Sequence, residues 1–284
     1  MKRRAPPARA GGASREDEPL ARPLPSTKAR SQFRKPPLNL FTTTLWEYPS
    51  QHYGGSIQGD RNYVGATPSW VIWQCLMRWT REGELVVDPM CGSGTTIDVC
   101  RDLKRRCLGF DLASHERRPD IRRADARSLP VEGGKADFVF VDPPYSTHVN
   151  YSEDPRCIGK LGALADGSGG RSGNGIVPDN EYYRAMRRSI AEMHRILKPG
   201  GHLALYVSDS FKKDAGFAPI GFHLFAILCE FFEPVDIISA VRRNASLDKG
   251  NFRRAAEEGA FMMRGFNYLF VMRKGSAQGA TRDG

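Results

Sequence analysis

The sequence predicts an α/β fold with a doubly wound, mostly parallel sheet. Short apolar runs alternate along the chain with segments of helical periodicity, an order that places helices on both faces of a parallel sheet. One apolar run also leads through a glycine-bearing turn directly into a helix, at residues 85–96. The pattern predicts strands at 85–87, 107–111, 137–141, 202–207, 235–241 and 267–272, and helices at 95–104, 181–197 and 219–232.

A further helix is expected immediately before the first of these strands, in the segment GATPSWVIWQCLMRWT. Thr67 is a favoured N-cap residue, and Pro68 suits the first helical position. Apolar residues then recur at helical spacing from Ile72 to Trp79. In the helix at 181–197 the same spacing ends at Lys-Pro-Gly-Gly, which stops a helix.

The length of 284 residues allows one α/β domain of about 200 to 250 residues with a tail. We expect the domain at residues 38–275, a disordered basic arm at 1–37 and a disordered tail at 276–284. Within the domain, the glycine-rich segment 146–180 lacks periodicity and is expected to be a mobile loop. Residues 242–265 form a basic insertion before the last strand.

The net charge of +10 is concentrated in the arm. Residues 1–37 contain ten lysines and arginines and three acidic residues, so they carry +7 of the total. Such an arm either binds nucleic-acid phosphates without sequence preference or keeps the protein soluble. The rest of the chain is only mildly basic.

The sequence contains no run of about 18 apolar residues, and its basic start is not followed by an apolar stretch. We therefore expect no membrane span and no secretory signal. The six cysteines form no CxxC pair and have no histidine at zinc spacing. They are expected to be reduced thiols in a cytoplasmic protein without a structural metal.

The segment LVVDPMCGSGTT, at residues 85–96, has the pattern of a ligand-binding turn. Gly92 and Gly94 allow the backbone to approach a ligand closely. The next strand ends about 20 residues later in Asp111, where an acid can accept hydrogen bonds from ribose hydroxyls. Asp125, in a loop after the third strand, is placed to accept from an adenine amino group. Together these residues predict a cofactor that contains a nucleoside.

A second chemical motif follows the buried strand in DFVFVDPPY. The strand delivers Asp142, Pro143, Pro144 and Tyr145 to the carboxyl edge of the sheet, where α/β proteins bind ligands. The two prolines fix the backbone and leave an acid and an aromatic ring at this edge. A proline-rich turn without function is the alternative interpretation.

DPMCGSGTT followed by DPPY resembles the amino-methyltransferases of nucleic acids, which form N6-methyladenine or N4-methylcytosine in DNA. GATPSWVIWQCL resembles an additional cofactor-binding helix of this family, and NYLFVMRK resembles its last strand. The resemblance covers residues 41–273. It implies the Rossmann-like class I methyltransferase fold, S-adenosylmethionine as cofactor and DNA as the partner, with RNA as the alternative.

The resemblance also implies roles for individual residues. The methionine part of the cofactor would be held by the turn and its neighbours, the ribose by Asp111, and the adenine by Asp125 and Ala126. Thr67 would contact the methionine carboxylate. The residues implied for the methionine part are Asp88, Cys91, Gly92, Gly94 and Thr95.

The implied reaction is methyl transfer to an exocyclic amino group, most readily N6 of adenine. Asp142 and the carbonyl of Pro143 would accept the two amino hydrogens, and Tyr145 would stack on a base flipped out of the helix. Cytosine N4 is the alternative target in DNA. Adenine is favoured over it, because enzymes that act on cytosine N4 more often have serine at the position of Asp142.

An RNA substrate is also compatible with the sequence. A tRNA or rRNA methyltransferase acting on guanine N2 or adenine N6 would carry DPPY too, although such enzymes usually have an RNA-binding domain. A non-catalytic nucleic-acid-binding protein that has kept the fold is the rival from a different class.

The family's usual target-reading domain has no counterpart, which leaves 146–180 and 242–265 as candidates for that role.

Overall fold

The sheet forms because its central strands are apolar on both faces. In the computed structural model, which describes residues 38–113, 116–145, 151–152, 154–162, 177–212, 216–241 and 250–276, eight strands are ordered β1-β9-β10-β6-β5-β2-β3-β4. Val86 and Val87 lie on opposite faces of the central strand β2, and both are completely buried. The strands are β1 (Leu45–Trp46), β2 (Leu85–Asp88), β3 (Arg106–Asp111), β4 (Ile121–Arg123), β5 (Ala136–Val141), β6 (Leu197–Val207), β9 (Glu233–Val241) and β10 (Phe266–Arg273).

All neighbouring strands of this sheet run parallel except at β10, which is antiparallel to both β6 and β9. The chain crosses from β3 and β4 on one side of β2 to β5 and β6 on the other, so the strand order reverses at β2. This is the order of the class I methyltransferase fold. The predicted doubly wound, mostly parallel sheet is therefore confirmed.

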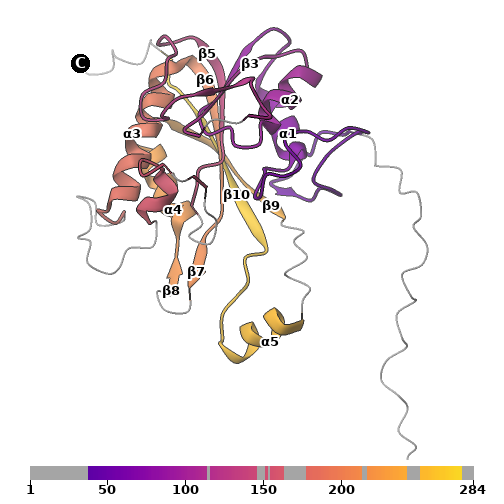
Figure 1. The fold of residues 1–284 in the computed structure, drawn as a ribbon, viewed down its shortest axis with the longest axis vertical. Helices are drawn as coiled ribbons and strands as arrows, with labels where there is room; N and C mark the ends of the chain where they lie inside the picture. The colour runs from indigo at the N-terminus through magenta and orange to yellow at the C-terminus, as the bar shows by residue number, and fades with distance from the viewer. Residues whose placement is uncertain are drawn as a thin grey trace, which may run out of the picture. The chain divides into compact units, whose positions relative to one another are not determined.

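Helices cover both faces of the sheet (Figure 1). On one face, α1 and α2 pack against a cluster that includes Val86 and Phe138. On the other face, α3 and α4 pack against a cluster that includes Val87 and Val139. The helices are α1 (Ser69–Trp79), α2 (Thr95–Asp102), α3 (Glu181–Ile196) and α4 (Ile220–Leu228).

Some helix boundaries differ from those predicted. The first helix has Pro68 as its N-cap, so the prediction that Thr67 caps the helix is wrong. The second helix stops at Asp102 instead of residue 104, because Lys104 adopts a left-handed backbone with φ of +56°. The fourth helix is shorter at both ends than the predicted range 219–232.

The structure adds elements that the periodicity did not reveal. Strands β1 and β4 are only two and three residues long, which is too short to show an alternating pattern. A hairpin follows β6, a 3₁₀ turn lies in the predicted loop, and a helix lies in the basic insertion. These elements are β7 (Ser210–Lys212), β8 (Gly216–Ala218), η1 (Ile158–Leu161) and α5 (Gly250–Glu258).

The predicted arm at 1–37, residues 277–284 of the tail, most of the loop at 146–180 and residues 242–249 of the insertion lie outside the described residues. In the part that is described, no helix combines the length and apolar character needed to cross a membrane. All six cysteines are free thiols, and four of them are buried.

Candidate active site

A cavity of about 670 Å³ lies where the carboxyl ends of β2, β3 and β5 meet. The strand order reverses at this point, and α/β sheets bind ligands at such positions. The structure brings the predicted site residues together here, because all of them except Gly94 line the cavity. The lining residues among them are Thr67, Asp88, Cys91, Gly92, Thr95, Asp111, Asp125, Ala126, Asp142, Pro143, Pro144 and Tyr145.

The turn between β2 and α2 requires glycine at two positions. Gly92 has φ of +48°, and a Cβ atom there would lie 2.8 Å from the Tyr63 hydroxyl oxygen. Gly94 has φ of +80°, and a Cβ atom there would lie 2.5 Å from Cζ of Arg118. A side chain at either position would be strained by the backbone and would collide with a neighbour. Gly94 therefore shapes the turn from outside the cavity.

Arg118 holds this turn to the start of α2. Its guanidinium donates hydrogen bonds to the carbonyl oxygen of Ser93 at 3.1 Å and to Oδ2 of Asp98 at 3.0 Å. Its side chain is only 13% exposed, which makes the ion pair with Asp98 less screened than one on the open surface. Sequence patterns did not indicate this role, because Arg118 lies in an irregular segment before β4.

Asp88 is a buried acid at the end of β2. It accepts hydrogen bonds from the Thr96 hydroxyl at 2.5 Å and from the backbone N–H of Met90 at 3.1 Å. Burial raises the pKa of Asp88 to about 7, because the charged form loses its hydration. Within the described residues no lysine or arginine pairs with this carboxylate. A cationic ligand would therefore supply the charge partner that it lacks.

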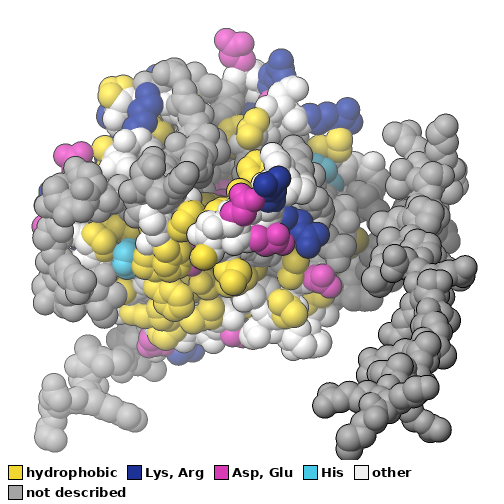
Figure 2. Space-filling model, turned by 90° about the horizontal axis from the view of Figure 1, so that it is seen from below, with side chains coloured by type: hydrophobic (Ala, Val, Ile, Leu, Met, Phe, Trp, Pro, Cys, Tyr) yellow, Lys and Arg dark blue, Asp and Glu magenta, His cyan; other side chains and the backbone are white. Residues whose placement is uncertain are grey.

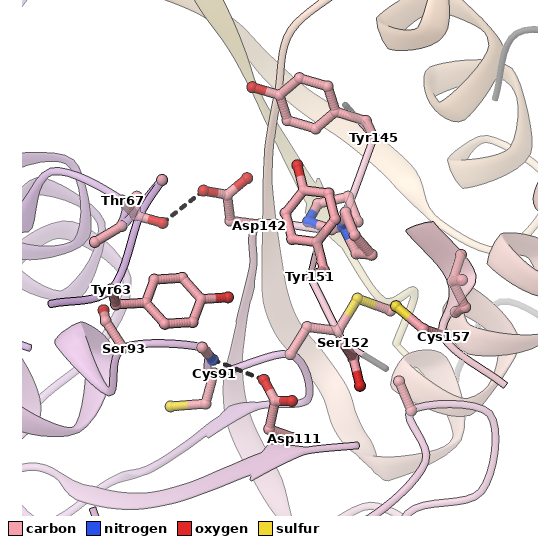
Figure 3. Close-up of a pocket in the computed structure, with 18 of the residues that line it drawn as sticks. Tyr63, Thr67, Cys91, Ser93, Asp111, Asp142, Tyr145, Tyr151, Ser152 and Cys157 are labelled. Carbon is pink, nitrogen blue, oxygen red and sulfur yellow. Dashed lines mark hydrogen bonds between the residues drawn. The ribbon is translucent and has the colours of Figure 1, made fainter. Parts of the chain in front are cut away.

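Asp111 stands at the end of β3 and faces the glycine turn. Its two oxygens accept hydrogen bonds from the backbone N–H of Gly92 at 2.9 Å and of Ala113 at 3.0 Å. Figure 3 shows the bond to the turn beside Cys91. The carboxylate is thus fixed at the cavity wall, where a carboxylate still has acceptor capacity for ribose hydroxyls.

Asp125 is placed at the cavity but is tightly bound by its own neighbour. Arg127 donates from Nε to Oδ1 at 2.8 Å and from Nη2 to Oδ2 at 2.6 Å. This fork of hydrogen bonds lowers the pKa of Asp125. Ala126 follows and is buried. An acid at this position can therefore be expected to remain ionised.

Asp142 leaves β5 and meets Thr67 across the cavity. The Thr67 hydroxyl donates a hydrogen bond to Oδ2 of Asp142 at 2.7 Å, which is drawn in Figure 3. Pro143 and Pro144 continue along the cavity wall. Tyr145 also lines the cavity, and its ring packs partly against the buried core between the sheet and α3.

Two further tyrosines line the cavity, and sequence patterns did not single them out. The ring of Tyr63 lies between the glycine turn and Asp142, and the ring of Tyr151 lies near Asp142 (Figure 3). Burial, followed by the charges of Asp111 and Asp142, raises the pKa of Tyr63, so its hydroxyl stays protonated. The sequence places Tyr63 four residues before Thr67, and this proximity was the only available signal.

The far wall of the cavity comes from the hairpin and the basic insertion. Phe211 of β7 stacks on Phe261 with 4.7 Å between ring centroids and 10° between planes. Arg264 lies over the ring of Phe217 at 5.2 Å. Figure 2 shows hydrophobic side chains gathered on the face seen from below. Met262, which is 79% exposed, contributes to the cavity rim.

Comparison with known proteins relates the chain to DNA-modifying methyltransferases. The sequence profile of a family described as DNA methylase matches residues 13–119 and 136–278. The type II methyltransferase M.SmaI of Serratia marcescens is 35% identical over 69 residues, which are 24% of this chain and 22% of that protein. The match thus spans about a fifth of the relative's length.

Solved structures resemble the chain only distantly. TrmN from Thermus thermophilus has a TM-score of 0.43 at 18% identity, over 74% of this chain and 50% of that one. The N-methyltransferase NodS from Bradyrhizobium japonicum WM9, in complex with S-adenosyl-L-homocysteine, has a TM-score of 0.42 at 14% identity, over 72% and 85%.

Neither TM-score reaches 0.5, so the fold class rests on the strand order of the chain itself. The family profile, in contrast, covers most of the sequence. The chain belongs to the DNA methylase family, and its cofactor is S-adenosylmethionine.

Proposed function

We propose that this chain transfers a methyl group from S-adenosylmethionine to the N6 amino group of adenine in DNA. The observation that carries the proposal is the position of Asp142-Pro143-Pro144-Tyr145, which line the same cavity as the glycine turn and the acids of β2 and β3. The cavity thus has two parts. The cofactor half is formed by the glycine turn with Asp88, Asp111 and Asp125, and the base half is formed by residues 142–145.

The cofactor half has the chemistry that S-adenosylmethionine requires. The cofactor carries a positively charged amino group and sulfonium, and Asp88 is a buried acid without a cationic partner among the described residues. Asp111 would accept from the ribose hydroxyls and Asp125 from the adenine amino group, with Ala126 against the ring. The turn residues Cys91, Gly92 and Thr95 would lie along the methionine part. When bound, the cofactor supplies an electrophilic methyl group.

The base half has the groups needed to activate an amine. An exocyclic amino nitrogen is a poor nucleophile, because its lone pair is delocalised into the ring. Asp142 and the carbonyl of Pro143 would accept its two hydrogens and favour a tetrahedral nitrogen, whose lone pair then points at the methyl group. The amino nitrogen would take the methyl group as its carbon–sulfur bond breaks, and the methylated nitrogen would then pass one proton to the Asp142 carboxylate and on to water. Tyr145 would stack on the flipped base.

Two arguments favour adenine in DNA. Asp142 at the start of the motif is the form usual in adenine enzymes, and the matching family is described as a DNA methylase. The target is expected to be reached from the side of Phe261, Met262 and Arg264, which rim the cavity and belong to the basic insertion. Cytosine N4 is the second candidate, and the RNA bases are the third.

The test is nucleoside analysis by mass spectrometry. The purified protein is incubated with isotopically labelled S-adenosylmethionine and either unmethylated DNA or RNA, and the nucleosides are then separated. We expect label in N6-methyladenine from DNA. Label only in N4-methylcytosine would overturn the choice of base, and label only in RNA would overturn the choice of polymer.

A further inference from the structure

We propose that Thr67 is a positioning residue that orients the carboxylate of Asp142 for the target amine. The inference rests on the proposed function and deepens it. The two side chains are 75 residues apart in sequence, yet the Thr67 hydroxyl donates to Oδ2 of Asp142 at 2.7 Å and both residues line the cavity. This bond restrains the rotation of the carboxylate about its last side-chain torsion, which is otherwise broad.

Thr67 cannot donate a hydrogen bond to Asp142 and to the carboxylate of the cofactor at the same time. A threonine hydroxyl has one hydrogen to donate, and a carboxylate can only accept. While Thr67 donates to Asp142, its side chain cannot also donate to the methionine carboxylate of S-adenosylmethionine. The structure therefore assigns the side chain of Thr67 to the catalytic half of the cavity.

Thr67 stands on a rigid support. Pro68 restricts the backbone of the residue that precedes it. Gln51 holds the chain on both sides of Thr67. Its side-chain amide donates to the carbonyl oxygen of Ala66 at 2.8 Å, and its main-chain carbonyl oxygen accepts from the backbone N–H of Ser69 at 3.0 Å. Ser69 then begins α1, whose residues 69–76 are all buried. A hydroxyl held in this way can fix the position of its partner.

The Thr67 hydroxyl does not cap α1. Pro68 is the N-cap of α1, and no side chain forms a capping hydrogen bond there. A charge-assisted bond to Asp142 therefore gives Thr67 a role that helix capping does not. An ionised carboxylate can accept about four hydrogen bonds, so the bond from Thr67 is compatible with acceptance from an amino group.

The test compares Thr67→Val, which keeps the shape of the side chain and removes the hydroxyl, with Thr67→Ser, which keeps the hydroxyl. Single-turnover methylation of DNA is measured with saturating cofactor, and the dissociation constant of S-adenosylmethionine is measured by calorimetry. Thr43→Val is the matched control, because the Thr43 hydroxyl donates to the nearby carbonyl oxygen of Leu45 at an exposed position. Thermal melting of each variant checks the fold.

We expect Thr67→Val to lower the single-turnover rate about ten- to hundredfold and to leave the dissociation constant unchanged. A hydrogen bond to a charged group contributes a free energy that corresponds to a rate difference of this size. Thr67→Ser should restore most of the rate. In an Asp142→Ala background, Thr67→Val should cause no further loss, since the two residues act as one unit.

Three outcomes would overturn the inference. The first is a weaker dissociation constant with a normal rate at saturation, which would assign Thr67 to the cofactor. The second is a full additional loss in the Asp142→Ala background, and the third is a normal rate in Thr67→Val. If the unaltered protein methylates no nucleic acid, it is the proposed function that fails instead.

Discussion

The backbone N–H of Gly92 donates a hydrogen bond to Oδ2 of Asp111 at 2.9 Å, so the turn that follows β2 is tied to the end of β3. The bond joins the two parts of the cavity proposed to hold the methionine and ribose parts of the cofactor. Removing the carboxylate would release the turn and delete the proposed acceptors together.

Asp111→Ala is therefore expected to weaken the binding of S-adenosylmethionine about ten- to hundredfold, since it removes hydrogen bonds to a charged acceptor. Asp111→Asn, which keeps one acceptor oxygen, should have a smaller effect. Calorimetry measures both variants, and Glu132→Ala at an exposed position serves as the control. An unchanged dissociation constant in Asp111→Ala would remove this residue from the proposed cofactor site.

Asp142→Ala separates chemistry from cofactor binding. The rate of methyl transfer should fall by about 10² to 10³, the usual loss for one preorganised polar group. The affinity for S-adenosylmethionine should not change, because Asp142 lies in the base half. Single-turnover kinetics and calorimetry test the two statements, with Asp179→Ala as an exposed control. A near-normal rate would show that Asp142 does not position the amine.

The raised pKa of Asp88 predicts that cofactor binding depends on pH. Burial places this pKa at about 7, so the acid is largely protonated below that pH. A cationic cofactor favours the ionised form, and binding should therefore release a proton and weaken as the pH falls from about 7 to 5. Calorimetry in buffers of different ionisation enthalpy counts the proton. Asp88→Asn should bind weakly at every pH and release none.

The same shift makes a prediction about stability. In the folded protein the pKa of Asp88 lies above its value in the unfolded chain, which is about 3.9. Protonation of Asp88 therefore stabilises the folded protein. This contribution is fully present below the pKa of Asp88 in the unfolded chain and is lost as the pH rises through its pKa in the folded protein. Asp88→Asn should thus stabilise the cofactor-free protein more at pH 8 than at pH 5. Urea unfolding at the two pH values measures the difference, and an equal effect at both would contradict the raised pKa.

Gly94→Ala should destabilise the protein more than Gly134→Ala. Both glycines have positive φ, +80° and +67°, so both substitutions carry a backbone cost of about 1 to 2 kcal/mol. Only at Gly94 would the new Cβ also meet a neighbour, the guanidinium of Arg118 at 2.5 Å, whereas nothing lies within 4 Å at Gly134. Urea unfolding gives both free energies. Equal losses would show that Arg118 moves aside without cost.

The sequence by itself determined the central strands, the helices between them and the chemical motifs at the strand ends. These features are local, since an apolar run followed by Asp88, Asp111 or Asp142 marks a buried strand and its end without knowledge of its neighbours. The turn at Gly92 and Gly94 was readable for the same reason. Alternation of strands and helices then implied that the acids would meet at one edge of the sheet.

Only the tertiary structure decided which side chains meet across that edge. Thr67 was predicted to cap a helix, but its hydroxyl bonds Asp142, a residue brought near by the order of the strands. The positions of Arg118 against the turn and of Phe211 against Phe261 likewise join segments that are distant in sequence. Such contacts depend on sheet order and on the packing of irregular segments. Periodicity describes only neighbours along the chain, so it cannot specify them.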